Sequence, residues 1–321
     1  MRKNQIIEIE NISDEEARAL LGASDQNLAI LCECLGLDIS FRDHRFLVRE
    51  CSNTQYEALK NILNSLYHMI EQNKAVHEQD IIYLCRSALK GENVDIDELS
   101  RHIVGRTLSG KIIYPKTQGQ LAFVKSMEKN TVVFAIGPAG TGKTFLAVIQ
   151  AVTALKKGDV KRIVLTRPAV EAGENLGFLP GDMKEKVDPY LTPLYDALND
   201  MLGNEQTQKF IDKGVIEIAP LAYMRGRTLD DSYVILDEAQ NTTSAQMKMF
   251  LTRLGFRSHM VITGDVTQID LKANVRSGLI EATRILKGID GIDILELSAD
   301  DVVRHPLVQK MIERYGEMEK R

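Results

Sequence analysis

Beyond residue 110 the chain repeats one pattern, in which short runs of valine, isoleucine and leucine alternate with longer amphipathic stretches. The runs predict strands over residues 111–115, 131–136, 162–166, 215–220, 233–237, 260–265 and 292–297. Helices are expected between them, for example over residues 120–128 and 244–254. Strands that are apolar along their whole length and alternate with helices indicate a parallel sheet covered on both faces. We therefore expect a doubly wound α/β domain over residues 110–321.

The first 73 residues follow a different pattern, which predicts a small α+β domain. A strand, two helices, a hairpin and a third helix are expected over residues 6–10, 13–21, 25–35, 37–48 and 56–70. This order, β-α-α-β-β-α, is that of a KH-type RNA-binding module. The turn between the first two helices reads GASD, however, and Asp25 places a carboxylate where a KH loop would hold a phosphate backbone. RNA binding by this turn and a plain packing role both remain open.

Between the two domains, residues 74–109 are charged and contain two short amphipathic pieces. They predict a helical linker, which can itself be packed. The expected division of the chain is therefore a KH-like domain over residues 1–73, the linker over 74–109 and the α/β domain over 110–321.

Composition and charge limit the partners. The chain has 321 residues and a formal net charge of -5, the wrong sign for holding nucleic acid by bulk electrostatics, so any such contact has to be a local patch. No apolar run approaches the roughly 20 residues of a membrane span, and the N-terminus lacks the apolar core of a signal peptide. We expect a cytoplasmic protein with no membrane partner, whose four cysteines are buried in a reducing compartment.

The run GPAGTGKT follows the strand predicted over residues 131–136 and precedes an apolar helix. In this context the glycines let the backbone curl so that its N–H groups form a nest for phosphate at a helix N-terminus. Lys143 can reach the β- and γ-phosphates, and the hydroxyl of Thr144 can bind magnesium. The residues expected to bind the nucleotide are Gly137, Pro138, Ala139, Gly140, Thr141, Gly142, Lys143 and Thr144. The sequence therefore predicts a P-loop that binds a nucleoside triphosphate, expected to be ATP, with Mg²⁺.

A second motif, YVILDEAQN, begins as an apolar strand and ends in two acidic residues. Asp237 lies at the expected carboxyl edge of the sheet, where it can hold the hydration shell of magnesium. Glu238 follows it and can deprotonate an attacking water, which a hydrolase needs and a P-loop kinase does not. The alternative is an acidic pair that only caps the next helix.

A third motif, VITGDVTQID, is also a strand that ends in polar residues. If it lies beside the P-loop strand, Thr263, Asp265 and Gln268 reach the γ-phosphate region from the side opposite Asp237. The amide of Gln268 can then bind the attacking water and a phosphate oxygen, and so report hydrolysis to a partner surface. The alternative is a polar turn at the strand end.

Three further features leave their roles open. Gln118, ahead of the P-loop strand, can read the adenine edge or lie exposed in solvent. Arg304 can act as an arginine finger at the γ-phosphate or form an ion pair with a neighbouring aspartate. Arg225 and Arg227 form a compact cationic loop that can face phosphate or be a solvated turn.

Several longer runs extend these motifs. They are GPAGTGKT, RPAVEAGENLGFLPGD, EKVDPYLTPLYDAL, IEIAPLAYMRGRTL, ILDEAQNTTSAQMKMFLTRLGF, TGDVTQIDL and DVVRHPLV. Together they resemble the phosphate-starvation-inducible, PhoH-like ATPases from about residue 110 onward, although Lys272 stands where that family usually has proline. The resemblance implies ATP hydrolysis, a RecA/helicase-like nucleotide site similar to that of superfamily-one helicases, and a role in RNA metabolism. It places residues 137–144, Asp237, Glu238 and Gln268 on family motif positions.

A helicase of that superfamily binds ATP between two α/β cores, whereas residues 110–321 have room for one sheet only. We therefore predict a ring or other head-to-tail homo-oligomer, in which a neighbouring subunit supplies Arg304, or else Arg225 or Arg227. The leading hypothesis is an ATPase that couples hydrolysis to remodelling RNA or an RNA–protein complex. The competing hypothesis is an ATP-gated adaptor that docks a protein partner and moves no nucleic acid.

Overall fold

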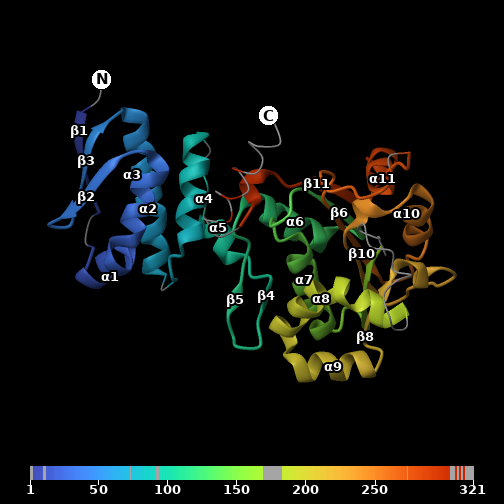
Figure 1. Cartoon of the computed structure of the whole chain (residues 1–321). Helices are drawn as coiled ribbons and strands as arrows, with labels where there is room; N and C mark the ends of the chain where they lie inside the picture. The colour runs from blue at the N-terminus through green and yellow to red at the C-terminus, as the bar shows by residue number, and fades with distance from the viewer. Residues whose placement is uncertain are drawn as a thin grey trace. The chain divides into compact units, whose positions relative to one another are not determined.

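The structure is a computed structural model. It describes residues 3–9, 12–72, 74–91, 94, 96–168, 183–272, 274–303, 308, 311 and 314. The side chains of residue 97 and of residues 183–190 lie outside this description. The chain forms two compact units, Met1–Arg101 with Val303–Arg321, and His102–Val302 (Figure 1). Within the described part of the chain, no helix has the length and apolar character needed to cross a membrane.

The first unit is built on a three-stranded antiparallel sheet with the strand order β1-β3-β2. Its elements are β1 (Lys3–Glu8), α1 (Asp14–Leu21), α2 (Gln26–Leu35), β2 (Asp38–Arg42), β3 (Arg45–Cys51), α3 (Asn53–Glu71), α4 (Glu78–Leu89) and α5 (Ile96–Arg101). The order β-α-α-β-β-α expected from the sequence is present, but it does not by itself define a KH module. The resemblance to that module stays a prediction.

Helix α4 lies in the segment expected to be a linker. Its residues Ile81, Leu84 and Cys85 are buried in the same core as Leu59 of α3. A hydrogen bond with Cys34, together with burial, raises the pKa of the Cys85 thiol, which therefore stays protonated and packs as a small apolar group. The helix thus belongs to the packed body of the first unit.

The second unit contains a parallel sheet of six strands in the order β11-β6-β10-β9-β7-β8. The strands are β6 (Val132–Ile136), β7 (Arg162–Arg167), β8 (Ile216–Pro220), β9 (Ser232–Leu236), β10 (His259–Gly264) and β11 (Ile292–Glu296). The helices of this unit are α6 (Gln118–Lys129), α7 (Lys143–Lys157), α8 (Met183–Leu202), α9 (Asn204–Asp212), α10 (Ser244–Leu251) and α11 (Gly278–Leu286). The predicted doubly wound α/β fold is therefore confirmed.

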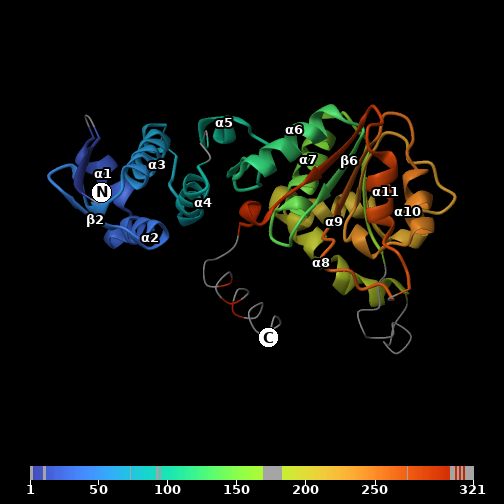
Figure 2. The same ribbon diagram turned by 90° about the horizontal axis from the view of Figure 1, so that it is seen from above.

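Successive residues of each strand enter two different cores. In β6, Val133 and Ala135 pack with residues of α6, α7 and α8, whereas Phe134 and Ile136 pack with residues of α10 and α11 (Figure 2). Because both faces of the sheet are covered, every residue of β6 is buried. This double burial is the physical reason for the continuous apolar runs in the sequence.

One predicted strand does not belong to the sheet. Residues 111–115 contribute only β5 (Ile112–Ile113), which pairs antiparallel with β4 (Gly105–Arg106) in a separate two-stranded ladder. Ile112 is 39% exposed, so this run is not covered on both faces. The prediction of a sheet strand here was wrong because a short apolar run does not reveal which partner it will find.

The segment after the last strand is tied to both α6 and the end of β6. Asp301 accepts hydrogen bonds from Thr117 Oγ1 at 2.6 Å and from the N–H of Gly119 at 3.1 Å, at the N-terminus of α6 where a negative charge is favourable. Leu297 donates its N–H to the carbonyl oxygen of Ile136 at 2.7 Å. Residues far apart in the sequence therefore jointly support the loop that follows β6.

Candidate functional site

A glycine-rich loop joins β6 to α7 at the carboxyl edge of the sheet. Gly140 and Gly142 have left-handed φ values of 88° and 78°, which residues with a Cβ rarely adopt. At Gly137 a Cβ would lie 2.5 Å from the carbonyl oxygen of Leu297. Helix α7 begins at Lys143, directly after the loop, so the N–H groups of its first turn favour an anion at this place.

Lys143 is folded over this loop. Its Nζ donates to the carbonyl oxygens of Gly137 at 2.6 Å and Pro138 at 2.8 Å, and to Thr141 Oγ1 at 3.1 Å. The ammonium group therefore lies among oxygen atoms next to the nest. A lysine has a flexible stem and rotatable donors, so it can exchange these oxygens for those of a phosphate.

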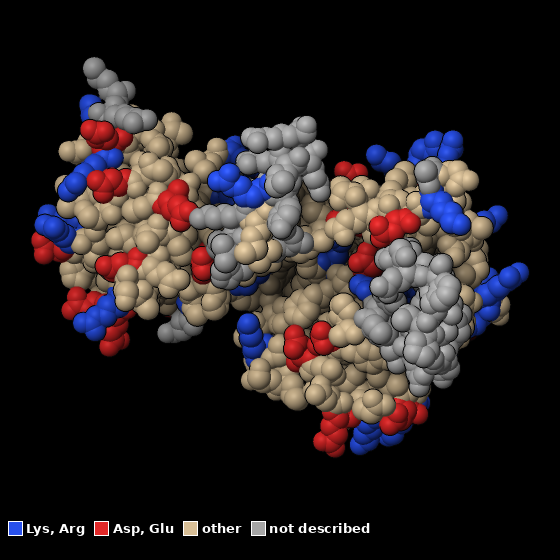
Figure 3. All heavy atoms as spheres, in the orientation of Figure 1, with Lys and Arg blue, Asp and Glu red and all other residues tan. Residues whose placement is uncertain are grey.

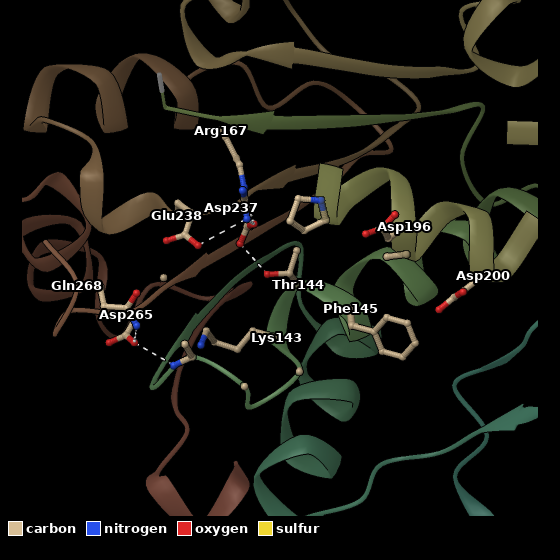
Figure 4. Close-up of a pocket in the computed structure, with 16 residues that line it drawn as sticks. Lys143, Thr144, Phe145, Arg167, Asp196, Asp200, Asp237, Glu238, Asp265 and Gln268 are labelled. Carbon is tan, nitrogen blue, oxygen red and sulfur yellow. Dashed lines mark hydrogen bonds and ion pairs between the residues drawn. The ribbon is translucent and has the colours of Figure 1, made fainter. Parts of the chain in front are cut away.

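The carboxylate of Asp237, which follows β9, accepts hydrogen bonds from three side chains, of which Thr144 and Arg167 are drawn in Figure 4. Its Oδ1 accepts from Thr144 Oγ1 at 2.7 Å and from Thr263 Oγ1 at 2.6 Å. Its Oδ2 accepts from Arg167 Nε at 2.8 Å, and Nη2 of the same arginine lies 3.5 Å from Glu238 Oε1. Asp237 is buried, so its charge is compensated by these donors and not by water.

The contact between Thr144 and Asp237 fits a magnesium site. Magnesium takes hard oxygen ligands and usually uses one or two protein groups, completing its shell with water and substrate phosphates. Thr144 Oγ1 and Asp237 Oδ1 are two such oxygens, 2.7 Å apart, beside the loop that would hold the phosphates. The donor set of this site therefore matches the metal that the sequence implies.

Glu238 has an unusual backbone conformation. Its φ of 54° and ψ of 37° lie in the left-handed region, which costs a residue with a Cβ roughly 1–2 kcal/mol. Its side chain is 44% exposed, and it accepts a hydrogen bond at Oε2 from Gln240 Nε2 at 2.6 Å. Such strain persists where neighbouring contacts hold it, and it is common at active sites.

Gln240 is fully buried and links three parts of the site. Besides Glu238, its Nε2 donates to the carbonyl oxygen of Gln268 at 3.1 Å. Its Oε1 accepts the backbone N–H of Asp265 at 3.0 Å. One amide group therefore fixes the carboxylate of Glu238 relative to the segment that follows β10.

Asp265 connects that segment to the P-loop. Its Oδ2 accepts the N–H of Ala139 at 2.9 Å and Gln268 Nε2 at 2.8 Å, while Oδ1 accepts the N–H and the hydroxyl of Thr267 at 2.9 and 2.6 Å. Burial acts to raise the pKa of Asp265, but the hydrogen bonds from Thr267 and Ala139 and the charge of Lys143 outweigh it and lower that pKa. The carboxylate is therefore ionised at neutral pH and holds the loop amide in place.

Many of the residues described above, including Lys143, Asp237 and Glu238, line one pocket of about 430 Å³, a volume typical of small-molecule sites. The lining runs from Gln268 and Asp265 across the P-loop to Phe145, and on to Asp196 and Asp200 of α8 (Figure 4). The cavity thus extends well beyond the phosphate nest, which leaves room for the remainder of a nucleotide.

The structure brings most of the predicted site residues together around this pocket. Its lining includes Ala139, Gly140, Gly142, Lys143, Thr144, Asp237, Glu238 and Gln268. Strand β10 lies beside β6, which the interpretation of Gln268 required. Thr263 had been expected to reach the site from the side opposite Asp237. Because β10 also pairs with β9, Thr263 instead contacts Asp237 directly.

The structure does not bring Gln118 to the pocket. It is exposed in the first turn of α6 and is not part of the pocket lining. Gln120, two residues further on, is buried; its Nε2 donates to the carbonyl oxygen of Thr141 at 3.0 Å, and its Oε1 accepts the N–H of Lys116 at 2.8 Å. The glutamine that contacts the P-loop is therefore Gln120, and the assignment of Gln118 to adenine stays a prediction.

The predicted arginines have different surroundings. Arg227 forms a bidentate ion pair with Glu217, with distances of 2.6 and 2.7 Å. Arg225 is exposed. Arg304 lies outside the described residues, so its role stays a prediction.

Two residues of this network were missed by the sequence analysis. Arg167 is the last residue of β7 and comes directly after the apolar run predicted over residues 162–166, and this position at a strand end was a signal that could have identified it. Gln240 offered no such signal, because its importance depends on which chain segments surround its side chain in space.

The loop between β6 and α7, with its lysine and the aspartate that contacts Thr144, defines the class of protein. The chain has the fold and the site of a P-loop nucleotide-binding ATPase. A family model described as "PhoH-like protein" matches residues 112–316, and the chain belongs to that family.

Individual relatives support this assignment. The chain is 55% identical over 301 residues to a PhoH-like protein of Bacillus subtilis, covering 94% of each chain. It is 45% identical over 307 residues to a PhoH-like protein of Synechocystis, covering 96% of this chain and 93% of the relative. It is also 45% identical over 206 residues to Protein PhoH of Escherichia coli, covering 64% of this chain and 58% of the relative. The resemblance inferred from the motifs is therefore confirmed.

Proposed function

We propose that this protein binds ATP with Mg²⁺ and hydrolyses it, and that hydrolysis drives the remodelling of RNA or RNA–protein complexes. The observation that supports hydrolysis best is the fixed carboxylate of Glu238. It lies next to Asp237 in the pocket of the P-loop, with a strained backbone and a hydrogen bond from Gln240. A site that only bound a nucleotide would not need a positioned base.

In this proposal, the loop amides and Lys143 bind the β- and γ-phosphates. Asp265 keeps the N–H of Ala139 oriented, which preserves the shape of the nest. Thr144 and Asp237, whose side-chain oxygens lie 2.7 Å apart, would hold the magnesium ion. When bound, the ion neutralises negative charge on the phosphate oxygens.

Glu238 is the proposed general base. One of its oxygens is held by Gln240, and the carboxylate accepts a proton from the water that attacks the γ-phosphate. Gln268 and Asp265 form the wall of the pocket next to the P-loop, where the Gln268 amide can contact the water or a phosphate oxygen. General base catalysis of this kind typically contributes about 10²–10⁴-fold to the rate.

We further propose that the active form is a homo-oligomeric ring in which Arg304 of a neighbouring subunit reaches the γ-phosphate. The 44% exposure of the Glu238 side chain supports this, because a hydrolytic site works best when excess water is excluded. Sedimentation and ATP turnover should then both change with protein concentration. A monomer whose turnover per subunit is independent of concentration would contradict the ring.

The substitution Glu238→Gln tests the hydrolytic role. It should leave ATP binding intact and slow phosphate release by about 10²–10⁴-fold, because the amide cannot accept the proton. Glu205→Gln, an exposed change on α9, is the matched control and should behave like the parent protein. An unchanged rate for Glu238→Gln would remove this residue from the mechanism.

Stimulation by RNA tests the second half of the proposal, which rests on the resemblance to helicase-type sites. Single-stranded RNA should increase ATP turnover at low salt. If it does not, the adaptor function is favoured, in which ATP sets a conformation and the first unit docks a protein partner.

A further inference from the structure

We propose that residues 221–228, here called the Tyr223 loop, form a contact site for single-stranded nucleic acid. Tyr223 would stack on a base, and Arg225 would pair with a phosphate. The inference rests on the proposed coupling of ATP hydrolysis to RNA, and it assigns that coupling to a particular surface.

The Tyr223 loop is anchored at both ends. Leu221 and Met224, in the short 3₁₀ helix η3 (Leu221–Met224), are 1% and 0% exposed and pack in the core that includes α10. Beyond the left-handed Gly226 (φ 76°), the ion pair of Arg227 with Glu217 fixes the other end. A ligand that binds here does not have to order the loop first, which lowers the cost of binding.

Two side chains project between these anchors. Tyr223 is 54% exposed, whereas Leu221 and Met224 at the two ends of η3 are buried. Arg225 is exposed, and its guanidinium forms no hydrogen bond or ion pair with any residue in the described ranges. An exposed aromatic ring and an exposed cation two residues apart on one anchored loop match the alternation of bases and phosphates along a single strand.

The surrounding charge requires such a local contact. The net charge of the chain is -5, and on the face shown in Figure 3 the basic and acidic side chains are interspersed. A strand of nucleic acid would therefore not be held by a broad positive field. It would have to be held by stacking and by individual cations, which is what Tyr223 and Arg225 offer.

The Tyr223 loop is also connected to the nucleotide site. It follows β8, whose last residue, Pro220, pairs with Arg167 in the parallel ladder. Arg167 in turn donates to Asp237. Paired strands lie about 4.8 Å apart. A displacement of Pro220, where the Tyr223 loop begins, would therefore move Arg167 on the neighbouring strand, and with it the hydrogen bond to the carboxylate of Asp237.

The test measures binding of the full-length protein to a fluorescent oligouridylate and to an oligothymidylate of equal length, by anisotropy over a range of salt concentrations. Tyr223→Ala should weaken binding by about tenfold, a typical loss for one stacked base, whereas Tyr223→Phe should retain most of the affinity. Arg225→Gln should also weaken binding and reduce the slope of log K against log salt by about 0.7, the value for one phosphate contact. Arg225→Lys should preserve the slope.

Two changes elsewhere serve as matched controls. Phe256→Ala removes an aromatic side chain that is 81% exposed and precedes the amino end of β10, whereas the Tyr223 loop follows the carboxyl end of β8. Arg284→Gln removes an exposed cation on α11. Both should bind like the parent, and all variants should keep the parent melting temperature.

The outcomes separate this inference from the proposed function. If Tyr223→Ala and Arg225→Gln bind both oligonucleotides like the parent, the contact site is overturned, while stimulation of ATP turnover by RNA would leave the proposed function intact. If the parent binds neither oligonucleotide and RNA does not stimulate ATP turnover, the RNA half of the proposed function fails and the contact site fails with it. Binding of oligothymidylate alone, lost in both variants, would support the contact but contradict RNA as the substrate.

Discussion

Gln240 holds Glu238 from a fully buried position, through a hydrogen bond of 2.6 Å between the amide Nε2 and Oε2 of the carboxylate. The amide takes no part in the proposed chemistry. It nevertheless sets where the proposed base lies, because the same group is also bound to the backbone of Asp265 and Gln268. The base, the P-loop and the strand end after β10 are therefore positioned as one network.

The substitution Gln240→Ala should separate positioning from binding. We expect ATP turnover to fall by about 10²-fold, because a base displaced by an ångström loses its alignment with the water, while ATP affinity changes little. The protein should also lose about 1–3 kcal/mol of stability, because the N–H of Asp265 is left buried without its acceptor. Gln208→Ala, at an exposed site on α9, is the control for both measurements. A loss of ATP affinity with unchanged maximal turnover would contradict the positioning role.

Asp265 should make the stability of the P-loop depend on pH. Its pKa is lowered in the folded protein, so its contribution is complete above the unfolded value of about 3.9 and is lost as the pH falls through the lower folded value. The difference in melting temperature between the parent protein and Asp265→Asn should therefore be constant near neutral pH and shrink in acid. Asp159→Asn, at an exposed turn, should show no such difference. A difference that grows as the pH falls would show that the carboxylate is not stabilised in its ionised form.

The contact of the P-loop with the end of β11 leaves no room for a side chain at Gly137. Gly137→Ala places a Cβ 2.5 Å from the carbonyl oxygen of Leu297, whose own N–H is bonded to Ile136, so neither strand can shift freely. We expect a loss of about 1–3 kcal/mol, as for other overpacked sites, together with the loss of ATP binding. Gly110→Ala is the control: it adds a Cβ into open space and should keep ATP binding despite its left-handed backbone. Equal ATP affinity for both variants would contradict the close contact.

The ion pair of Arg167 with Asp237 should be strongly coupled. Asp237 is buried and Arg167 largely so, with side chains 4% and 15% exposed, so Arg167→Gln should cost about 3 kcal/mol by leaving a buried carboxylate with fewer donors. Adding Asp237→Asn should restore part of this loss, giving a coupling energy of about 1–3 kcal/mol in a denaturant double-mutant cycle. The exposed pair of Arg257 with Asp231 provides the comparison and should show weaker coupling. Additive effects at Arg167 and Asp237 would mean that the two charges do not depend on each other.

The strands and the P-loop could be predicted from the sequence because their physical causes are local. A parallel strand covered on both faces has to be apolar throughout, and β6, β9 and β10 were expected within one or two residues of their observed bounds. The phosphate nest needs glycines at fixed spacing, which the run GPAGTGKT displays. Such features depend on neighbours in sequence and not on the order of strands.

The parts that could not be predicted depend on the order of strands or on the direction of a side chain. The position of β10 between β6 and β9 decides that Thr263 contacts Asp237, and no apolar run specifies that position. Gln118 and Gln120 lie two residues apart on a helix, about 200° around its axis, so only one of them can face the P-loop. The hydrophobic pattern did not indicate which one, because it did not locate the N-terminus of this helix to within two residues.

The bond from Thr117 to Asp301 spans 184 positions of the chain. During synthesis, α6 and the P-loop leave the ribosome long before the strand and turn that complete their support. Until β11 has joined the sheet, the loop has neither Leu297 behind it nor Asp301 at the start of the helix that carries Gln120. A nascent chain should therefore become able to bind a nucleotide only late in its synthesis and in one step, so incomplete chains would not hydrolyse ATP.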